Sequence, residues 1–477
     1  MIKHLNLILI SSILFSFILS ILLSSNNLSK YDINVIDGDH SYHKMIKTDP
    51  YRYLSHGSEI KEQLKEGKNF FETGREHYTK YLPARLAAFY YYIFDINFSD
   101  NDKPGPQVNT GNHFYYLLIQ NFIYYLSILF LYFSVKKNFN KTVVFSAVIF
   151  LCLEPTIFQY HSTFWSESIF FSFQIIIMAL IFREKKSIYS YIFIGLFTGI
   201  LSLQKQLGIF YIVPIIVFVF FFDKKKLVNK FLLIFFGFCI IQTFLGINNF
   251  YRSGIFYIMT ADTKIEMHRV LVRRVITKVD NISSKEFNKR EGIAVYEWIK
   301  KNQIKIDKNS NALKNSKTFV NYRDSILNEK DKIAFDGFIR KRTFKYIFDY
   351  PWEFTKQALK GAIHTPLLNP FHIFSEHNFR SSEIYYLSKK HDELVPLRII
   401  YSLFIYLIVG FGFFYFLKKK EYEKLFFLLI STLYFYATIF WHGNTRYFVP
   451  CMIYLSFLFG AGINYLILSF NKKLNKI

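Results

Sequence analysis

The chain has 477 residues, of which 52% are hydrophobic and 20% aromatic. This apolar share is too high for a typical soluble enzyme, while the 20% of charged residues is too many for a bare helical bundle. The composition therefore indicates a polytopic membrane protein with extramembrane parts. A formal net charge of +24 often signals nucleic-acid binding, but here much of the excess lies in short breaks between apolar runs. Membrane topology explains that distribution better, and no nucleic-acid partner is expected.

Ten apolar segments predict transmembrane helices, because each approaches the roughly 20 residues that cross the hydrocarbon core. They are expected at about 5–24, 113–134, 142–159, 164–182, 188–204, 207–222, 229–248, 396–417, 424–440 and 447–469. A cleaved signal peptide is the alternative for the first. Its length and the lack of an A-x-A-like site after it favour an uncleaved anchor.

The turns between these segments alternate between Lys-rich and chemically mixed sequences. The Lys-rich turns are 136–141, 183–186, 223–230, 418–424 and the tail from Asn471. Because Lys and Arg are enriched on the cytoplasmic side of membrane proteins, these turns and the N terminus are expected inside. The segments expected outside are 25–112, 160–163, 205–206, 249–395 and 441–446.

Three regions follow from this topology. Residues 1–248 are expected to form a transmembrane core whose outer loop, 25–112, carries an acidic motif. Residues 249–395 are expected to form an extracytoplasmic segment or small domain, and residues 396–477 the C-terminal transmembrane helices. Within the first outer loop, the run Tyr81–Phe94 predicts an amphipathic helix at the membrane interface, with a buried or re-entrant helix as the alternative.

Two acidic features lie on the expected outer side. Asp37 and Asp39 flank Gly38 about a dozen residues after the first span. Such a pair is able to bind a divalent metal through its oxygen atoms, although the same pattern is common in turns and caps. Glu167 stands at the start of a span, where a carboxylate is either functional or a favourable partner of the positive helix end.

Two cations on the expected outer side depart from the positive-inside pattern. Lys205 interrupts an apolar hairpin, and Arg446 precedes a span, where the positive end of a helix disfavours a cation. A phosphate group would compensate both charges. The alternative is that each side chain snorkels to the lipid headgroups.

Several stretches together resemble one family of membrane enzymes. They are Val35–Met45, Gly67–Phe71, Lys80–Pro83, Trp165–Phe171, Gly195–Lys205 and Asn444–Pro450. In order and position these stretches are similar to the GT-C superfamily of membrane glycosyltransferases. The resemblance is closest to the branch that contains protein O-mannosyltransferases and the aminoarabinose transferases of lipid A. It extends over nearly the whole chain except residues 249–395, which match no domain of that family.

The resemblance implies a fold and a reaction. The fold would be an all-α, GT-C-like bundle of about 10–12 transmembrane helices, with a large first outer loop and a mixed outer segment before the last three helices. The enzyme would move a monosaccharide from a polyprenyl-phosphate carrier to a hydroxyl of a lipid, glycan or protein acceptor. The reaction would take place among membrane lipids at the outer, periplasmic face of a bacterial inner membrane, and no nucleotide-binding motif is found in the sequence.

The resemblance also implies roles for individual residues. In an inverting transfer, a carboxylate accepts the proton of the acceptor, and cations stabilise the departing phosphate. Asp37 or Asp39 would be the base, both would hold a divalent metal if one takes part, and Glu167 would orient the acceptor or the loop. The candidate ligands of the donor phosphate are Lys80, Arg85, Lys205, Arg252 and Arg446.

Two other classes of membrane protein fit part of the pattern. A polysaccharide polymerase or ligase would also use a lipid-linked donor at the outer face. A transporter of lipid-linked glycans would also have many spans, but transporters typically show two paired halves with broken helices. The expected seven spans before segment 249–395 and three after it do not suggest such halves.

Overall fold

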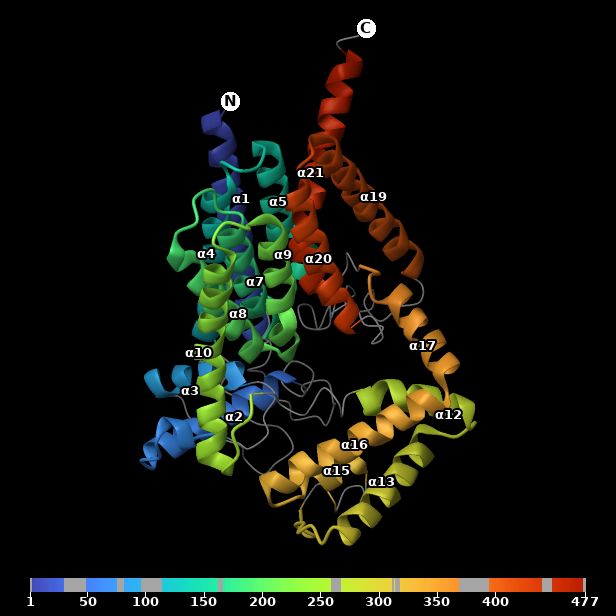
Figure 1. Ribbon diagram of the computed structural model, residues 1–477. Helices are drawn as coiled ribbons and strands as arrows, with labels where there is room; N and C mark the ends of the chain where they lie inside the picture. Colours follow the sequence, from blue (N-terminus) through green and yellow to red (C-terminus); the bar gives the residue numbers. More distant parts are fainter. Residues whose placement is uncertain are drawn as a thin grey trace.

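The computed structural model describes residues 2–29, 49–74, 81–95, 114–161, 166–258, 267–310, 313, 318–368, 394–439 and 448–474. Over these ranges the protein is all-α, and the only β pairing is an isolated bridge between Ile306 and Ile326. Long helices form a bundle at one end of the molecule, and shorter helices gather at the other end (Figure 1). The fold class expected from the sequence is confirmed.

The described part of each apolar segment expected from the sequence is mainly helical. Before the large hydrophilic segment the helices are α1 (Ile2–Ser29), α4 (Phe114–Val135), α5 (Lys141–Leu153), α6 (Pro155–Phe158), α7 (Glu167–Ile181), α8 (Ile188–Gln204), η4 (Gln206–Tyr211), α9 (Ile212–Phe222) and α10 (Leu227–Ser253). After it they are α19 (Val395–Lys419), α20 (Tyr422–Ile439) and α21 (Val449–Leu474). In the described part of the chain, α1, α4, α10, α19 and α21 are long and apolar enough to cross a membrane by length and composition. The chain is therefore an integral membrane protein.

Two expected spans contain a break. The segment 142–159 is interrupted at Glu154, whose extended backbone (φ −65°, ψ 120°) separates α5 from α6. Pro155 explains this break, because the residue before a proline is sterically excluded from the helical region. The segment 207–222 begins with the 3₁₀ turn η4, which follows an extended Lys205 (φ −148°, ψ 136°). Both breaks expose backbone groups that side chains have to satisfy.

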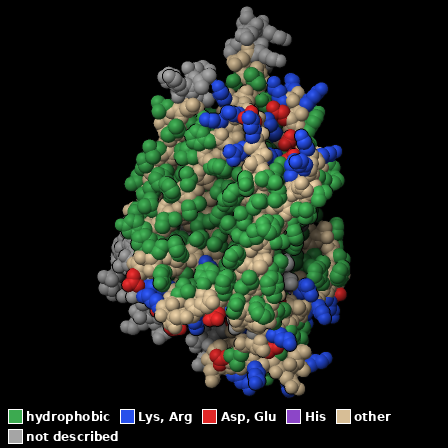
Figure 2. Space-filling view, turned by 60° about the vertical axis from the view of Figure 1, so that its left-hand side comes forward, with side chains coloured by type: hydrophobic (Ala, Val, Ile, Leu, Met, Phe, Trp, Pro, Cys, Tyr) green, Lys and Arg blue, Asp and Glu red, His purple; other side chains and the backbone are tan. Residues whose placement is uncertain are grey.

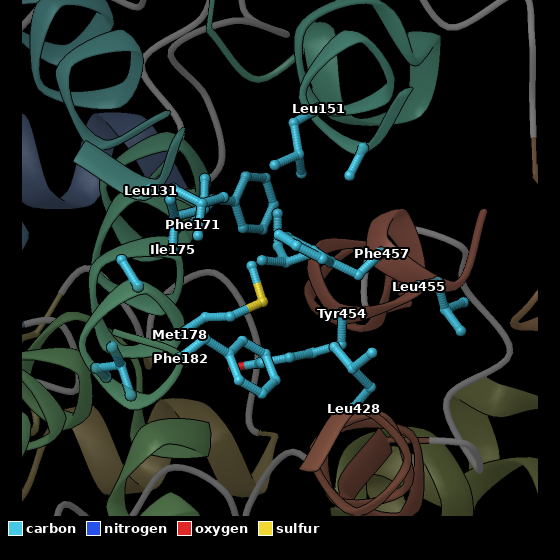
Figure 3. Close-up of a cluster of buried hydrophobic side chains, with 14 of the residues drawn as sticks. Leu131, Leu151, Phe171, Ile175, Met178, Phe182, Leu428, Tyr454, Leu455 and Phe457 are labelled. Atoms are coloured by element: carbon cyan, nitrogen blue, oxygen red, sulfur yellow. The ribbon is translucent and has the colours of Figure 1, made fainter. Parts of the chain in front are cut away.

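Buried aromatic and aliphatic side chains fill the interior of the bundle. Figure 3 shows part of this cluster, where Leu131 of α4, Phe171 and Met178 of α7, and Tyr454 and Phe457 of α21 point toward one another. Lipid tails are as apolar as these side chains, so close van der Waals packing, and not exclusion from water, holds such helices together.

Glycines set the closest helix contacts. A Cβ atom built on Gly412 of α19 would lie 1.8 Å from the Leu458 carbonyl oxygen of α21, and one on Gly462 would lie 1.9 Å from the Ile408 carbonyl oxygen. The pair α8 and α10 approaches in the same way, since a Cβ on Gly195 would lie 2.0 Å from the Ile234 carbonyl oxygen. These backbones touch only because the residues lack side chains.

Three short elements of the first hydrophilic segment lie beyond one end of the bundle: α2 (Asp49–Lys65), η2 (Phe70–Glu72) and α3 (Tyr81–Ile93). The helix expected over Tyr81–Phe94 is present. Its buried face, which includes Ala87 and Tyr91, packs against α2, while Phe89 and Tyr92 are exposed. The helix therefore has one buried face and one exposed face.

The second hydrophilic segment forms a helical unit at the same end of the molecule. Its elements are the π-helix η5 (His268–Val272), α12 (Arg273–Val279), α13 (Ser284–Lys301), α15 (Phe319–Asp324), α16 (Glu329–Asp349) and α17 (Pro351–His364). The buried carboxylate of Glu291 accepts hydrogen bonds from His268 Nε2 at 3.0 Å, the Arg342 guanidinium at 2.8 and 2.7 Å, and the Tyr346 hydroxyl at 2.6 Å. These bonds join η5, α13 and α16.

The opposite end of the bundle is basic. The N-terminal end of α1 and the C-terminal end of α21 both lie there (Figure 1), as an even number of crossings requires. Figure 2 shows Lys and Arg side chains gathered at this end, above a broad belt of hydrophobic side chains. We call it the basic end, and the end with α2, α3 and the helical unit the site end. The positive-inside rule predicts that the basic end faces the cytoplasm.

Gly412→Ala should destabilise the protein, because its methyl group would meet a backbone carbonyl that cannot rotate away. The expected cost is that of overpacking, about 1–3 kcal/mol. Gly410→Ala in the same helix is the matched control, since its Cβ would meet nothing within 4 Å. Thermal unfolding of both variants in the same detergent checks this, and an equal midpoint for the two would contradict the packing of α19 on α21.

The pH dependence of the helical unit should follow Glu291. Burial raises the pKa of its carboxyl, but the hydrogen bonds from His268 and Arg342 outweigh that effect and hold the pKa well below its usual range. A carboxyl with a lowered folded-state pKa stabilises the fold above its unfolded pKa, about 4.3, and this contribution is lost as the pH falls below that value. The protection of α13 and α16 against hydrogen exchange in the full chain, measured relative to the intrinsic exchange rate at each pH, should therefore fall in acid. Glu291→Gln should remove most of this pH dependence, and an unchanged profile would contradict the role of Glu291.

Candidate active site

Glu167 is the first residue of α7, at the site end of the bundle. Its side chain is fully buried. A carboxylate in the first turn benefits from the positive end of the helix, but that interaction alone does not offset burial of a charge. Glu167 therefore requires a cationic partner.

Lys205 is that partner. It lies at the break between α8 and η4, and its Nζ is 2.6 Å from Glu167 Oε1. The Lys205 side chain is 12% exposed, and its ammonium group also lies 5.6 Å from the centre of the Phe170 ring. Next to it, Gln204 Nε2 donates to the Ser166 carbonyl oxygen at 2.8 Å. The start of α7 and the end of α8 are thus joined by an ion pair and a hydrogen bond.

Two arginines lie near each other at the same end. Arg85 of α3 donates from Nη1 to Thr73 Oγ1 at 2.5 Å and from Nη2 to the Thr73 carbonyl oxygen at 2.7 Å. Arg252, in the last turn of α10, donates from Nη2 to Asn249 Oδ1 at 2.5 Å. A Cβ atom on Gly74 would lie 3.7 Å from Arg85 Nη2 and 3.8 Å from Arg252 Nη1. We call Arg85 and Arg252 the arginine pair.

The arginine pair brings two positive charges together. Burial lowers the pKa of Arg85, and the neighbouring charge of Arg252 lowers it further. Guanidinium groups stay protonated in proteins, so both side chains keep their charge. A phosphate is well matched to such a pair, because guanidinium forks bind its oxygens in a bidentate manner.

Packing places the arginine pair and the ion pair on adjoining elements. Helix α3, which carries Arg85, packs against α8, which ends at Lys205. The turn η2 packs against α10, and Asn248 Nδ2 donates to the Phe71 carbonyl oxygen at 2.6 Å. The first hydrophilic segment is therefore fixed onto the end of the bundle where Glu167 lies.

Glu154 is a buried acid that the sequence analysis did not single out. Its Oε2 accepts from the Ile157 backbone N–H at 2.8 Å, and its Oε1 accepts from Thr156 Oγ1 at 2.8 Å and the Tyr401 hydroxyl at 3.2 Å. These contacts cap α6 and tie it to α19. A carboxylate directly before a proline within an apolar run is the sequence signal that would have indicated this cap.

The remaining predicted site residues fall outside the residues that the structure describes. They are Asp37, Asp39, Lys80 and Arg446. The proton acceptor and two of the phosphate ligands, Lys80 and Arg446, therefore stay predictions from sequence. Among the described residues, no three His, Cys, Asp or Glu side chains come together as a metal site would require.

Comparison with known proteins identifies one family. Residues 107–246 match the family model described as dolichyl-phosphate-mannose-protein mannosyltransferase. No curated protein and no solved structure matches the chain. The matched region runs from before α4 into α10, and it contains Glu154, Glu167 and Lys205.

The family match agrees with the fold. Its region consists of the apolar helices that form the first part of the bundle, and the ion pair lies inside it. This agrees with the family resemblance drawn from the short motifs. Over residues 107–246, less than a third of its length, the chain is therefore similar to a family of membrane glycosyltransferases of the GT-C superfamily.

Proposed function

We propose that this glycosyltransferase moves a monosaccharide from a polyprenyl-phosphate carrier to an acceptor hydroxyl, with inversion, at the site end of the bundle. The family match supports a lipid-linked donor, since the members are described by a sugar phosphate on a polyprenol-type lipid. The positive-inside rule favours a basic end that faces the cytoplasm. The site end, at the other end of the bundle, then faces outward. The acceptor is a lipid, a glycan or a protein.

The observation that carries this proposal is the gathering of Lys205, Arg85 and Arg252 on adjoining elements at one end of an apolar bundle. A donor whose lipid tail lies among the helices would present its phosphate at the end of the bundle. Cations fixed there stabilise the negative charge that grows on the bridging oxygen as the glycosidic bond breaks.

Glu167 has a positioning role in this proposal. Its carboxylate is buried and already bound to Lys205 Nζ, so it is poorly placed to accept a proton from an incoming hydroxyl. It instead fixes the ammonium group at the break after α8. In this proposal the base is Asp37 or Asp39, which the sequence places in the first hydrophilic segment.

The proposed reaction then balances as follows. The acceptor oxygen forms a bond to the anomeric carbon, and the bond from that carbon to the phosphate oxygen breaks. The leaving phosphate takes the electron pair, and the carboxylate of Asp37 or Asp39 takes the acceptor proton. The products are a new glycoside and a polyprenyl phosphate, held by Lys205 and the arginine pair.

Transfer by the purified protein in liposomes tests the function. With polyprenyl-phosphate mannose as the first donor probe, release of polyprenyl phosphate should fall by about 100-fold or more when the base is removed, in Asp37→Asn or Asp39→Asn. Loss of one charge-assisted contact in Arg252→Gln should lower turnover about 10-fold or more. Lys68→Gln, an exposed residue of the same segment, is the control. Small and equal losses at both aspartates would contradict a catalytic base there.

The ion pair allows a second test that separates stability from function. Each single variant breaks the buried contact between Lys205 Nζ and Glu167 Oε1, so Glu167→Gln and Lys205→Gln should each destabilise the protein. The double variant should recover part of this loss, because both charges of the contact are removed together. Its transfer rate should nevertheless stay low, since the cation is still missing. Recovery of both unfolding midpoint and transfer in the double variant would show that the pair is only structural.

A further inference from the structure

The basic end contains a cavity of its own. Its volume is 730 Å³, and its walls come from the turns that join α4 to α5, α7 to α8 and α9 to α10, together with the start of α20. It lies at the opposite end of the bundle from the Glu167–Lys205 pair (Figure 1). We call it the basic cavity. Nothing in the transfer reaction makes use of it.

The charges that line the basic cavity do not balance. Six Lys and Arg side chains and three carboxylates line its walls, and one of the lysines, Lys424, pairs at 2.9 Å with Glu421, which does not line the cavity. Two of the lysines, Lys186 and Lys230, are largely buried, with 16% and 14% of their side chains exposed. Both pair with the same carboxylate, Asp223, which also accepts from the Tyr191 hydroxyl at 2.5 Å. The single carboxylate of Asp223 thus forms ion pairs with two buried ammonium groups.

The other two carboxylates are exposed and form no ion pair with Lys186 or Lys230 among the described residues. Glu184 and Glu423 lie at the rim and face solvent, as do the cations Arg183 and Lys225. Burial lowers the pKa of Lys186, and the charge of Lys230 acts in the same direction, while Asp223 and Glu423 oppose it. An additional anion inside the cavity would stabilise both lysines in their charged form.

A phosphate group fits this need. Lysine binds phosphate as a point charge, and basic pockets between the cytoplasmic ends of transmembrane helices bind anionic headgroups. At the basic end, the Lys and Arg side chains in Figure 2 border the belt of hydrophobic side chains, and phospholipid headgroups lie at such a boundary. We propose that the basic cavity binds a phosphate group at the membrane surface, carried by an anionic phospholipid or free in solution. This proposal does not depend on the transfer reaction.

The two phosphate sources are tested in separate arms. In the lipid arm, protein in detergent is mixed with phosphatidylglycerol or phosphatidylcholine, and bound lipid is counted by native mass spectrometry. In the free arm, inorganic phosphate is titrated while thermal unfolding is followed. The variants are Lys186→Gln and Lys230→Gln in the cavity, Arg183→Gln at its mouth, and Asp223→Asn. Lys419→Gln is the control, an exposed lysine at the same end that does not line the cavity.

The variants should move binding in opposite directions. Each buried lysine that is removed should weaken phosphate binding about 5- to 10-fold, and Arg183→Gln should weaken it less. Asp223→Asn should strengthen binding, because it removes the competing carboxylate. Preference for phosphatidylglycerol identifies a lipid ligand, and stabilisation by inorganic phosphate alone identifies a free one. Binding that is equal in the wild type, the cavity variants and the control, in both arms, would overturn the proposal. If the lysine variants do not fold, Arg183→Gln and Asp223→Asn decide it alone.

Discussion

The cost of burying charge in an apolar bundle governs how this protein is built. A charged group within the helices has to find a partner, because neither lipid nor a packed interior can solvate it. Glu167 and Lys205 meet that requirement together, at 2.6 Å. Their pairing joins the start of α7 to the end of α8, and it occurs where helical hydrogen bonding is already interrupted. The same two residues thus stabilise a break in the bundle and keep an ammonium group in place at the site end.

The packing between helices makes such breaks tolerable. Close backbone contacts at Gly412 and Gly195 bring α19 against α21 and α8 against α10, so the framework around the breaks is rigid. At the first break the Glu154 side chain accepts from the Ile157 N–H, and at the second Gln204 links the end of α8 to the Ser166 carbonyl oxygen. Packed helices with locally irregular ends are a suitable support for the proposed phosphate site.

The helical unit at the site end is built on a different principle. It contains small apolar clusters of its own. Its helices are linked mainly through the carboxylate of Glu291, which accepts hydrogen bonds from three side chains on two other helices. The unit is attached to the bundle through α17, whose Ala362 carbonyl oxygen accepts from the Tyr436 hydroxyl at 2.8 Å. The Pro366 carbonyl oxygen accepts from Tyr406 at 2.6 Å. Polar bonds to backbone groups thus position this unit next to the membrane helices.

The sequence alone determined the class, the helical segments and the asymmetry of charge between the two ends, because apolar length and Lys-rich turns are local properties. It also singled out Glu167, Lys205, Arg85 and Arg252 as residues of interest. Only the tertiary structure decided that Glu167 pairs with Lys205, and that Arg85 and Arg252 share the space beside Gly74. Those contacts join residues that are 38 and 167 positions apart, and no local pattern encodes such a distance. The sequence analysis missed the cap at Glu154 and the hydrogen bonds around Glu291 for the same physical reason. The hydrogen-bond donors of a buried carboxylate can be distant in sequence, and only the fold brings them to it.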